Sequence, residues 1–194
     1  MGTVVMHNVA SVDGFIADPD DQVGPLHEWY FSGDTAIGPA EDSDFRVPAA
    51  SARYVGSTWA SLGVIVMGRR LFDLTNGWEG HPPAGEHVVV VSHRPKPDGW
   101  HPEASYYFVD DLNSAMDTAQ RLAGDRVVAV NAGVVGGQIL AAGLIDEVAM
   151  DIVPVVFGSG RRFFGDVDSQ HLLEDPHVVI RSERVLHLRY KVRR

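Results

Sequence analysis

The segment Val64-Ile65-Val66-Met67-Gly68-Arg69-Arg70 decides the fold of this chain. Its first four residues are apolar, and a glycine stands on each side of them, Gly63 before and Gly68 after. A short apolar run with such boundaries is typical of a parallel strand that is buried on both faces. Parallel strands need long crossover connections, which are usually helical, so the segment predicts an α/β sheet with helices packed against it.

Strand-like and helix-like segments alternate on both sides of this segment. Apolar residues within 112–122 recur at steps of three and four, as on one face of a helix, and Asp110 or Asp111 can cap its start. The pattern predicts one α/β domain, residues 1–194, with a mixed, mainly parallel sheet and helices on both faces. We expect strands at residues 4–9, 64–67, 88–91, 106–109, 127–130 and 145–156, and helices at residues 49–62, 112–122 and 134–142.

The C-terminal segments 178–180 and 185–192 are expected to form an antiparallel hairpin. Leu186 and Leu188 alternate with His187 and other polar residues in the second segment. Side chains of a strand point to opposite faces in turn. The alternation therefore predicts one face toward the core and one face, which carries His187, toward water.

The composition is that of a globular chain and argues against several classes of protein. Its 194 residues are 45% hydrophobic, and the net charge of −10 disfavours a nucleic-acid partner, which needs clustered Lys and Arg. Without Cys, disulfides and thiolate metal sites are impossible. No segment approaches the roughly 18 apolar residues of a membrane span. The N-terminus lacks a signal-peptide pattern, so we expect a cytoplasmic protein with no membrane partner.

The first of three strand ends that could bind a ligand is Gly68-Arg69-Arg70-Leu71. Gly68 permits a tight turn, and the helix start that follows presents free N–H groups suited to a phosphate. The two guanidinium groups would add charge-assisted hydrogen bonds. The alternative is an ordinary strand-to-helix turn with two solvated arginines, and the residues alone do not decide between the two.

A second strand end, Ser92-His93-Arg94, also offers a hydroxyl and a cation after a buried strand. These are ordinary loop residues, so the pattern gains weight only when it is paired with the first strand end. Arginines at strand ends distinguish sites for NADPH, which carries an extra ribose phosphate, from sites for NADH. The pair therefore predicts NADPH as the cofactor.

The third strand end is followed by Gly133-Val134-Val135-Gly136-Gly137. Small residues there would let a pyrophosphate approach the backbone at a helix N-terminus. The spacing is not G-x-G-x-x-G, and close packing of a helix on the sheet explains the glycines equally well. Ligands of open α/β sheets bind outside the carboxyl ends of the strands, and all three ends would lie along that one edge.

Several motifs resemble the reductase domain of riboflavin biosynthesis, within the dihydrofolate-reductase-like superfamily. They are Ser11-Val12-Asp13-Gly14-Phe15-Ile16-Ala17, Met67-Gly68-Arg69-Arg70 and Gly143-Leu144-Ile145-Asp146-Glu147, followed by Val153-Pro154-Val155-Val156-Phe157-Gly158-Ser159-Gly160. Their shared order over residues 4–164 is specific to the superfamily. The chain departs from the pattern at Asn131-Ala132-Gly133, where the family usually has two or three glycines. It also lacks the Cys that the zinc deaminase half of the bifunctional riboflavin enzyme needs.

The resemblance implies a three-layer dihydrofolate-reductase-like fold, a homodimer, and NADPH-dependent reduction of a small heterocyclic, ribosylamino-pyrimidine or pterin-like substrate. The alternative is an NADP-binding sensor or binding protein that keeps the nucleotide site without turnover. The substrate would enter between the 18–44 loop and residues 157–162. At the nicotinamide, the expected cofactor residues are Val9, Ala10 and Ile16. At the adenosine side they are Gly68, Arg69, Arg70, Leu71, Ser92, His93 and Arg94, and at the pyrophosphate they are Gly133, Val134, Val135, Gly136 and Gly137. The residues expected to contact substrate are Trp29, Phe157 and Arg161.

The source of the proton is the least defined part of this proposed chemistry. Adding a hydride to a C=N or C=O bond also needs a proton, and Asp13 after the first strand is the candidate catalytic residue. The alternative, which we favour, is an aspartate that only hydrogen-bonds its own turn, with an ordered water as proton source. The scattered histidines match no zinc spacing, so no metal is expected.

Overall fold

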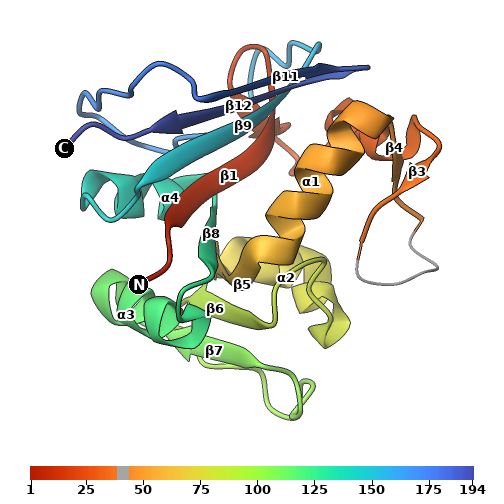
Figure 1. The fold of residues 1–194 in the computed structure, drawn as a ribbon. Helices are drawn as coiled ribbons and strands as arrows, with labels where there is room; N and C mark the ends of the chain where they lie inside the picture. Colours follow the sequence, from red (N-terminus) through yellow and green to blue (C-terminus); the bar gives the residue numbers. More distant parts are fainter. Residues whose placement is uncertain (39–43) are drawn as a thin grey trace.

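The computed structural model describes residues 1–38 and 44–194, and an eight-stranded sheet forms its centre (Figure 1). The strand order is β11-β12-β9-β1-β8-β5-β6-β7. β1 (Val4–Ser11) lies between β8 (Val127–Asn131) and β9 (Glu147–Val153) and runs parallel to both. The parallel part continues from β8 through β5 (Leu62–Gly68), β6 (His87–Val91) and β7 (Tyr106–Val109).

The helices form close to where the sequence predicts them. Asp111 caps α3, since its carboxylate accepts the backbone N–H of Ser114 at 2.8 Å. None of the helices within the described ranges is long and apolar enough to cross a membrane. The α-helices are α1 (Ala49–Ser61), α2 (Arg69–Thr75), α3 (Leu112–Ala123) and α4 (Val134–Ala141), and two 3₁₀ segments are η1 (Gly24–Phe31) and η2 (Asn76–Gly80).

Helices cover both faces of the sheet, as predicted. On one face, Met6 of β1 packs in a core that takes in buried residues of α3 and α4. On the other face, Val9 of β1 packs with Val55 of α1 and Trp29 of η1. β1 is thus buried on both sides, and the mixed, mainly parallel sheet of the α/β prediction is confirmed (Figure 1).

The strand expected at residues 145–156 is shorter than predicted at both ends, since β9 runs from Glu147 to Val153. Pro154 follows, and it has no N–H to donate to a neighbouring strand. The N–H of Val155 then donates back to the carbonyl of Val153 at 2.7 Å, which turns the chain away from the sheet.

The C-terminal hairpin is confirmed, but its predicted water-facing side is wrong. β11 (Val178–Ser182) pairs antiparallel with β12 (Val185–Lys191), which pairs antiparallel with β9. His187 is 0% exposed, whereas Leu186 and Leu188 are only partly buried. The polar side of β12 lies under α1 and η1, where Asp151 of β9 is the neighbour of His187 in register. A buried polar partner therefore reverses the inward and outward sides that hydropathy alone predicts.

The sequence did not predict two short β-ladders, because their strands are too short to show a period in the apolar residues. β2 (Phe15–Ala17) pairs antiparallel with β10 (Arg161–Arg162), which joins the chain after β1 to a segment near the other end of the sequence. β3 (Thr35–Ala36), inside the predicted 18–44 loop, pairs with β4 (Arg46–Val47) just after that loop. Residues 39–43 of that loop lie outside the described residues.

Two glycines of α4 are required by close packing. A Cβ on Gly136 would lie 2.6 Å from the carbonyl oxygen of Asn131, and one on Gly137 would lie 2.2 Å from that of Phe164. Real Cβ atoms do not approach backbone oxygens so closely, so α4 can sit on its neighbours only if both side chains are absent. Of the two explanations for these glycines, the structure favours packing.

We predict that Gly137→Ala lowers the free energy of unfolding by about 1–3 kcal/mol, since the added methyl group overpacks a backbone contact. Gly56→Ala is the matched control, because a Cβ on this exposed residue of α1 meets nothing within 4 Å. It should raise stability by about 0.5–1 kcal/mol. Urea unfolding measures both, and equal effects of the two changes would contradict the packing explanation.

Candidate cofactor site and a buried histidine network

The carboxyl ends of the parallel strands meet along one edge of the sheet, as predicted. Gly68 at the end of β5 is level with Val91 at the end of β6. Asn131, the last residue of β8, is level with His7 of β1. This common register places the three predicted strand ends side by side.

Contacts between these ends join them into one surface. A Cβ on Gly68 would come within 2.9 Å of Val135 at the start of α4, so the ends of β5 and β8 touch. The N–H of Gly133 donates to the carbonyl of Phe163 at 2.7 Å, and the N–H of Phe163 donates to that of Gly14 at 2.8 Å. The turn after β1 is thereby tied to the start of α4.

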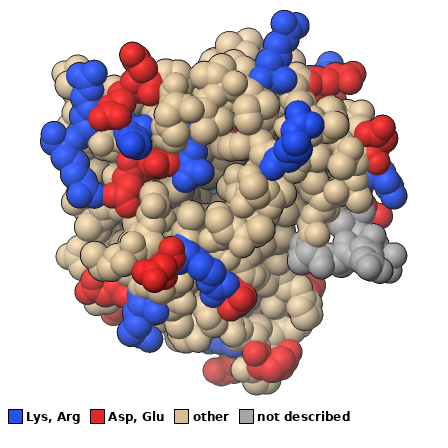
Figure 2. Space-filling view, viewed as in Figure 1, with Lys and Arg blue, Asp and Glu red and all other residues tan. Residues whose placement is uncertain are grey.

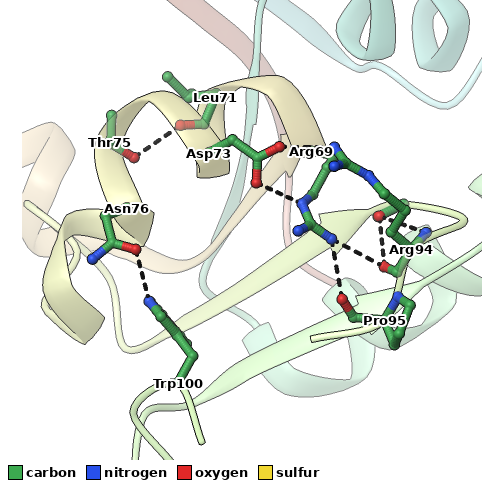
Figure 3. Close-up of polar contacts among 9 residues, drawn as sticks. Arg69, Leu71, Asp73, Thr75, Asn76, Arg94, Pro95 and Trp100 are labelled. Atoms are coloured by element: carbon green, nitrogen blue, oxygen red, sulfur yellow. Dashed lines mark hydrogen bonds and ion pairs between the residues drawn. The ribbon is translucent and has the colours of Figure 1, made fainter. Parts of the chain in front are cut away.

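Arg69 is bound mainly within the protein (Figure 3). Its Nε donates to Asp73 at 2.7 Å, and its Nη1 donates to the carbonyl of Pro95 at 3.0 Å. The guanidinium carbon lies 5.4 Å from the centre of the Phe72 ring, and the side chain is only 16% exposed. Arg69 therefore joins the start of α2 to the loop after β6 and keeps few N–H groups for a ligand.

Arg94 is placed differently, with its head group open to solvent. Its side chain is 65% exposed and donates to Asp73 at 2.7 Å (Figure 3). Ser92 fixes the backbone beneath it, because the Ser92 hydroxyl donates to the Arg94 carbonyl at 2.7 Å and accepts the Arg94 N–H at 3.0 Å. Although burial opposes the effect, hydrogen bonds from Arg69 and Arg94 lower the pKa of Asp73. Arg94 is thus an accessible cation at this strand end, and the exposed His93 lies beside it in the chain.

Arg70 and Arg161 converge on one carboxylate in the loop after β2. Arg70 forms a two-pronged ion pair with Asp21, and Arg161 Nε donates to Asp21 Oδ1 at 2.7 Å. Hydrogen bonds from Arg70 and Arg161 lower the pKa of Asp21 to about 2. Asp21 therefore ties three separate segments together, and Arg161, predicted to contact substrate, is engaged in this contact.

Asp13 bridges two loops. Its carboxylate accepts the Ser11 hydroxyl at 2.6 Å and the backbone N–H groups of Phe157 and Gly158 at 3.1 and 2.7 Å. The hydrogen bond from Ser11, followed by those from Gly158 and Phe157, lowers the pKa of Asp13. A carboxylate held ionised in this way is a poor proton donor, so the geometry favours a structural role for Asp13.

The predicted nicotinamide and substrate residues differ in their access to a ligand. Val9, Ala10 and Trp29 are 2%, 0% and 0% exposed, so their side chains belong to the core. Ile16 lies at the edge, where its Cδ1 is the nearest atom, at 3.4 Å, to a Cβ built on Gly133. Ile16 is therefore the predicted nicotinamide neighbour that the fold leaves within reach.

A chain of four polar side chains, which the sequence patterns missed, crosses the core beneath α1. Ser51 Oγ lies 2.9 Å from His187 Nε2, and His187 Nδ1 lies 2.6 Å from Asp151 Oδ1. The other carboxylate oxygen of Asp151 lies 3.0 Å from His7 Nε2. Burial alone would raise the pKa of Asp151, but the charge of His7 and the hydrogen bonds from His187 and His7 lower it to about 2. The one signal for this network in the sequence was the presence of His7 and Asp151 inside the largely apolar strands β1 and β9.

The surface charges are mixed. On the face in Figure 2, Lys and Arg alternate with Asp and Glu instead of forming one broad basic area. Within residues 1–38 and 44–194, no three His, Asp or Glu side chains gather in a way that could hold a metal ion.

Comparison with known proteins assigns the family. Residues 2–187 match the model of the RibD C-terminal domain. Because the match spans nearly all of the 194 residues, the chain belongs to the RibD C-terminal domain family. A search of curated proteins finds no match.

Solved structures share the fold at low sequence identity. A protein from Shewanella sp. PV-4, named only as a candidate riboflavin biosynthesis protein, has a TM-score of 0.70 and 23% identity over 100% of both chains. A pyrimidine reductase-like protein from Corynebacterium diphtheriae has a TM-score of 0.63 and 16% identity, over 100% of this chain and 92% of its own. The diaminohydroxyphosphoribosylaminopyrimidine deaminase/5-amino-6-(5-phosphoribosylamino)uracil reductase of Thermotoga maritima has a TM-score of 0.66 and 13% identity, over 99% of this chain but only 57% of the enzyme. These matches confirm the expected dihydrofolate-reductase-like fold.

The sheet edge has features that fit a dinucleotide phosphate. Gly133 has a φ of 102°, and Val134 beside it is 53% exposed. Among residues 1–38 and 44–194, no side chain caps the start of α4, so the N–H groups of its first turn lack a partner there. Asn131, in place of a family glycine, has a buried side-chain oxygen without a partner in the described part of the chain. Because buried polar atoms are almost always hydrogen-bonded, that oxygen suits a ligand or a water.

We predict that Asp21→Asn removes a contribution to stability that depends on pH. The pKa of Asp21 is lowered in the folded chain, so its two ion pairs stabilise the fold above the unfolded pKa of about 4. That stability is lost as the pH falls toward about 2. Asn keeps the backbone, since it tolerates the φ of 64° at this position.

Urea unfolding from pH 7 to pH 2 measures this effect. The wild-type protein should be more stable than Asp21→Asn by about 1 kcal/mol at pH 7, with the difference disappearing toward pH 2. A difference that stays constant with pH would contradict the ion-pair account.

Proposed function

We propose that this protein is an NADPH-dependent reductase of a small heterocyclic substrate of the ribosylamino-pyrimidine or pterin type. One observation carries the proposal: the parallel register brings the ends of β5, β6 and β8 to a single edge. Ligands of α/β sheets bind at such edges. Membership of the RibD C-terminal domain family supports the reaction class, and the name of the Thermotoga relative includes a uracil reductase.

Different residues of this edge bind different parts of NADPH. When bound, NADPH supplies the hydride. Arg94, with Ser92 and His93 beside it, binds the phosphate on the adenosine side, because its guanidinium is exposed on a fixed backbone. Arg69 holds the loop after β6 in place through hydrogen bonds to its backbone. The start of α4 at Gly133 faces the pyrophosphate, and Ile16 borders the nicotinamide.

We predict that Arg94→Ala weakens NADPH binding about 10–100-fold and leaves NADH binding nearly unchanged, since one charge-assisted contact to the extra phosphate is lost. Arg69→Ala should weaken both nucleotides and also lower the melting temperature, because Arg69 supports the loop itself. Titration calorimetry with each nucleotide measures the affinities.

Arg121→Ala is the matched control, an exposed arginine in the last turn of α3. It should change neither affinity. Equal losses of NADPH and NADH affinity in Arg94→Ala would remove the phosphate role of Arg94. Failure of the wild-type protein to bind either nucleotide would remove the proposed function.

We also propose that the protein forms a homodimer through the C-terminal hairpin, as the resemblance implies. β11 is an edge strand that leaves Val179 60% exposed, and Leu188 of β12 lies beside it in register. Such an apolar edge favours pairing with a second chain. Light scattering at micromolar concentration should give about twice 21.1 kDa, and a mass near 21.1 kDa would contradict the dimer.

A further inference from the structure

Two arginines from separate elements converge on the carboxylate of Asp21. Arg70 lies in the first turn of α2, and Arg161 lies in β10. The Nε groups of both side chains donate to Asp21 Oδ1, at 3.0 and 2.7 Å. Paired guanidinium groups bind phosphate groups in the same way as they bind carboxylates. The position that the Asp21 carboxylate fills therefore also suits the anion of a ligand.

The turn that carries Asp21 is closed on itself. The carboxylate of Asp18 accepts the backbone N–H groups of Asp20 and Gln22, each at 2.8 Å. The N–H of Asp18 donates to the carbonyl of Gln22 at 3.0 Å. These local hydrogen bonds hold residues 18–22 in a compact shape, so the turn can move as one unit.

The two arginines fasten this turn to the protein. Within residues 1–38 and 44–194, the hydrogen bonds that residues 19–22 make outside the turn all go to Arg70 and Arg161. Pro19, Asp20 and Gln22 are exposed, so no buried apolar side chain adds to the contact. Partly exposed ion pairs contribute little to stability. The turn can therefore leave its place at a small cost in free energy.

The two guanidinium groups are open to a ligand. The side chains of Arg70 and Arg161 are 62% and 43% exposed, whereas that of Asp21 is 9% exposed. Among the described residues, Asp21 accepts the hydrogen bonds of Arg70, and Asp21 and the Pro19 carbonyl accept those of Arg161. Both acceptors belong to the 18–22 turn. Movement of that turn would free both guanidinium groups at once.

The turn lies beside the sheet edge where we place NADPH. β2, directly before it, brings Ile16 next to Gly133 at the start of α4. The tip of the turn reaches Arg70 in α2, which directly follows β5. Residues 15–21 thus extend from the expected nicotinamide side of the edge to the end of β5, where the expected adenosine side begins.

We propose that Arg70 and Arg161 form a phosphate-binding site, that Asp21 occupies it as an internal substitute for the ligand, and that a phosphate group of the ligand displaces Asp21 and moves the 18–22 turn. For the identity of the ligand, the proposal rests on the proposed reductase function. The phosphate belongs either to the diphosphate of NADPH or to the phosphate monoester of a ribosylamino substrate.

Charge and backbone geometry both favour the exchange. A diphosphate or a phosphate monoester carries more than one negative charge at neutral pH and offers more acceptor oxygens than a carboxylate. Asp21 has a φ of 64°, in the left-handed region that costs residues other than glycine free energy. A displaced turn can leave that conformation. Binding of the ligand is then weakened by the fraction of molecules in which Asp21 fills the site.

Titration calorimetry with inorganic pyrophosphate, NADP⁺ and ribose 5-phosphate tests the exchange. Asp21→Asn should bind the ligand of this site about 3–10-fold more tightly than the wild-type protein, because the competing carboxylate is lost. A gain shared by pyrophosphate and NADP⁺ assigns the site to the cofactor, and a gain with ribose 5-phosphate assigns it to the substrate. The absence of a gain with all three probes would overturn the proposal.

Three variants control for charge alone. Asp20→Asn removes the same charge one residue away, where the carboxylate has no partner in the described part of the chain. Its affinities should stay within about twofold of wild type, because exposed charges are screened. Added to Asp21→Asn, Arg161→Gln should abolish the gain, whereas Arg162→Gln, at the exposed neighbour, should keep it. Equal gains in Asp20→Asn and Asp21→Asn would overturn the proposal.

Thermal unfolding tests the exchange without any nucleotide. Without ligand at pH 7, the ion pairs of Asp21 should make the wild-type protein melt at a higher temperature than Asp21→Asn. Saturating pyrophosphate breaks those ion pairs in the wild-type protein if it displaces Asp21, so the difference in melting temperature should disappear. A difference that persists at saturation would show that Asp21 only fastens the turn, and it would overturn the proposal.

The outcomes separate this proposal from the proposed function. If the wild-type protein binds no dinucleotide while Asp21→Asn gains affinity for pyrophosphate, the reductase function fails and the phosphate site stands. If the wild-type protein and Asp21→Asn bind NADP⁺ equally and neither other probe shows a gain, the phosphate site fails and the reductase function stands. A crystal structure with the tightest ligand should show phosphate oxygens within hydrogen-bond distance of Arg70 and Arg161. Intact ion pairs of Asp21 beside a ligand bound elsewhere would overturn the proposal.

Discussion

The structure depends on one register, the parallel pairing of β1 with β8 on one side and β9 on the other. Side chains alternate along a strand, so a slip of one residue would send Met6 to the wrong face and His7 into the opposite core. In the observed register, Met6 packs with α3 and α4, and His7 comes within hydrogen-bond distance of Asp151. The same pairing sets the carboxyl ends of the strands level, so the candidate cofactor edge and the buried network follow from a single constraint.

The buried network carries a cost in hydration that its own hydrogen bonds offset. A carboxylate such as Asp151 would lose several kcal/mol of hydration on burial, and its two imidazole partners offset that loss. Apolar residues of similar volume commonly replace such groups without loss of stability. A protein that needed only a stable core would gain little from Ser51, His187 and Asp151 at this place.

The sequence predicted what depends on local pattern. The apolar run at residues 64–67, the periodic helix at 112–122 and its Asp111 cap are properties of neighbouring residues, and the structure has them nearly where expected. The strand expected at 145–156 stopped early at Pro154, a local signal that the apolar pattern outweighed.

What could not be predicted depends on distant partners. His187 looks water-facing until Asp151 is placed beside it, and His7 and Asp151 are 144 residues apart in the chain. Likewise, Arg69 resembles a phosphate ligand by residue type, yet the carbonyl of Pro95 takes up one of its donors. The choice between a pyrophosphate turn and helix packing at Gly137 rested on Phe164, which no nearby residue indicates.

The central claim is that the carboxyl ends of β5, β6 and β8 form one NADPH site, and a crystal structure of the protein with NADP⁺ tests it most directly. The account predicts the adenosine-side phosphate at Arg94 and Ser92, the pyrophosphate beside Gly133, and the nicotinamide against Ile16. A nucleotide bound on another face of the sheet, or an edge that stays unoccupied in crystals soaked with millimolar NADP⁺, would contradict it.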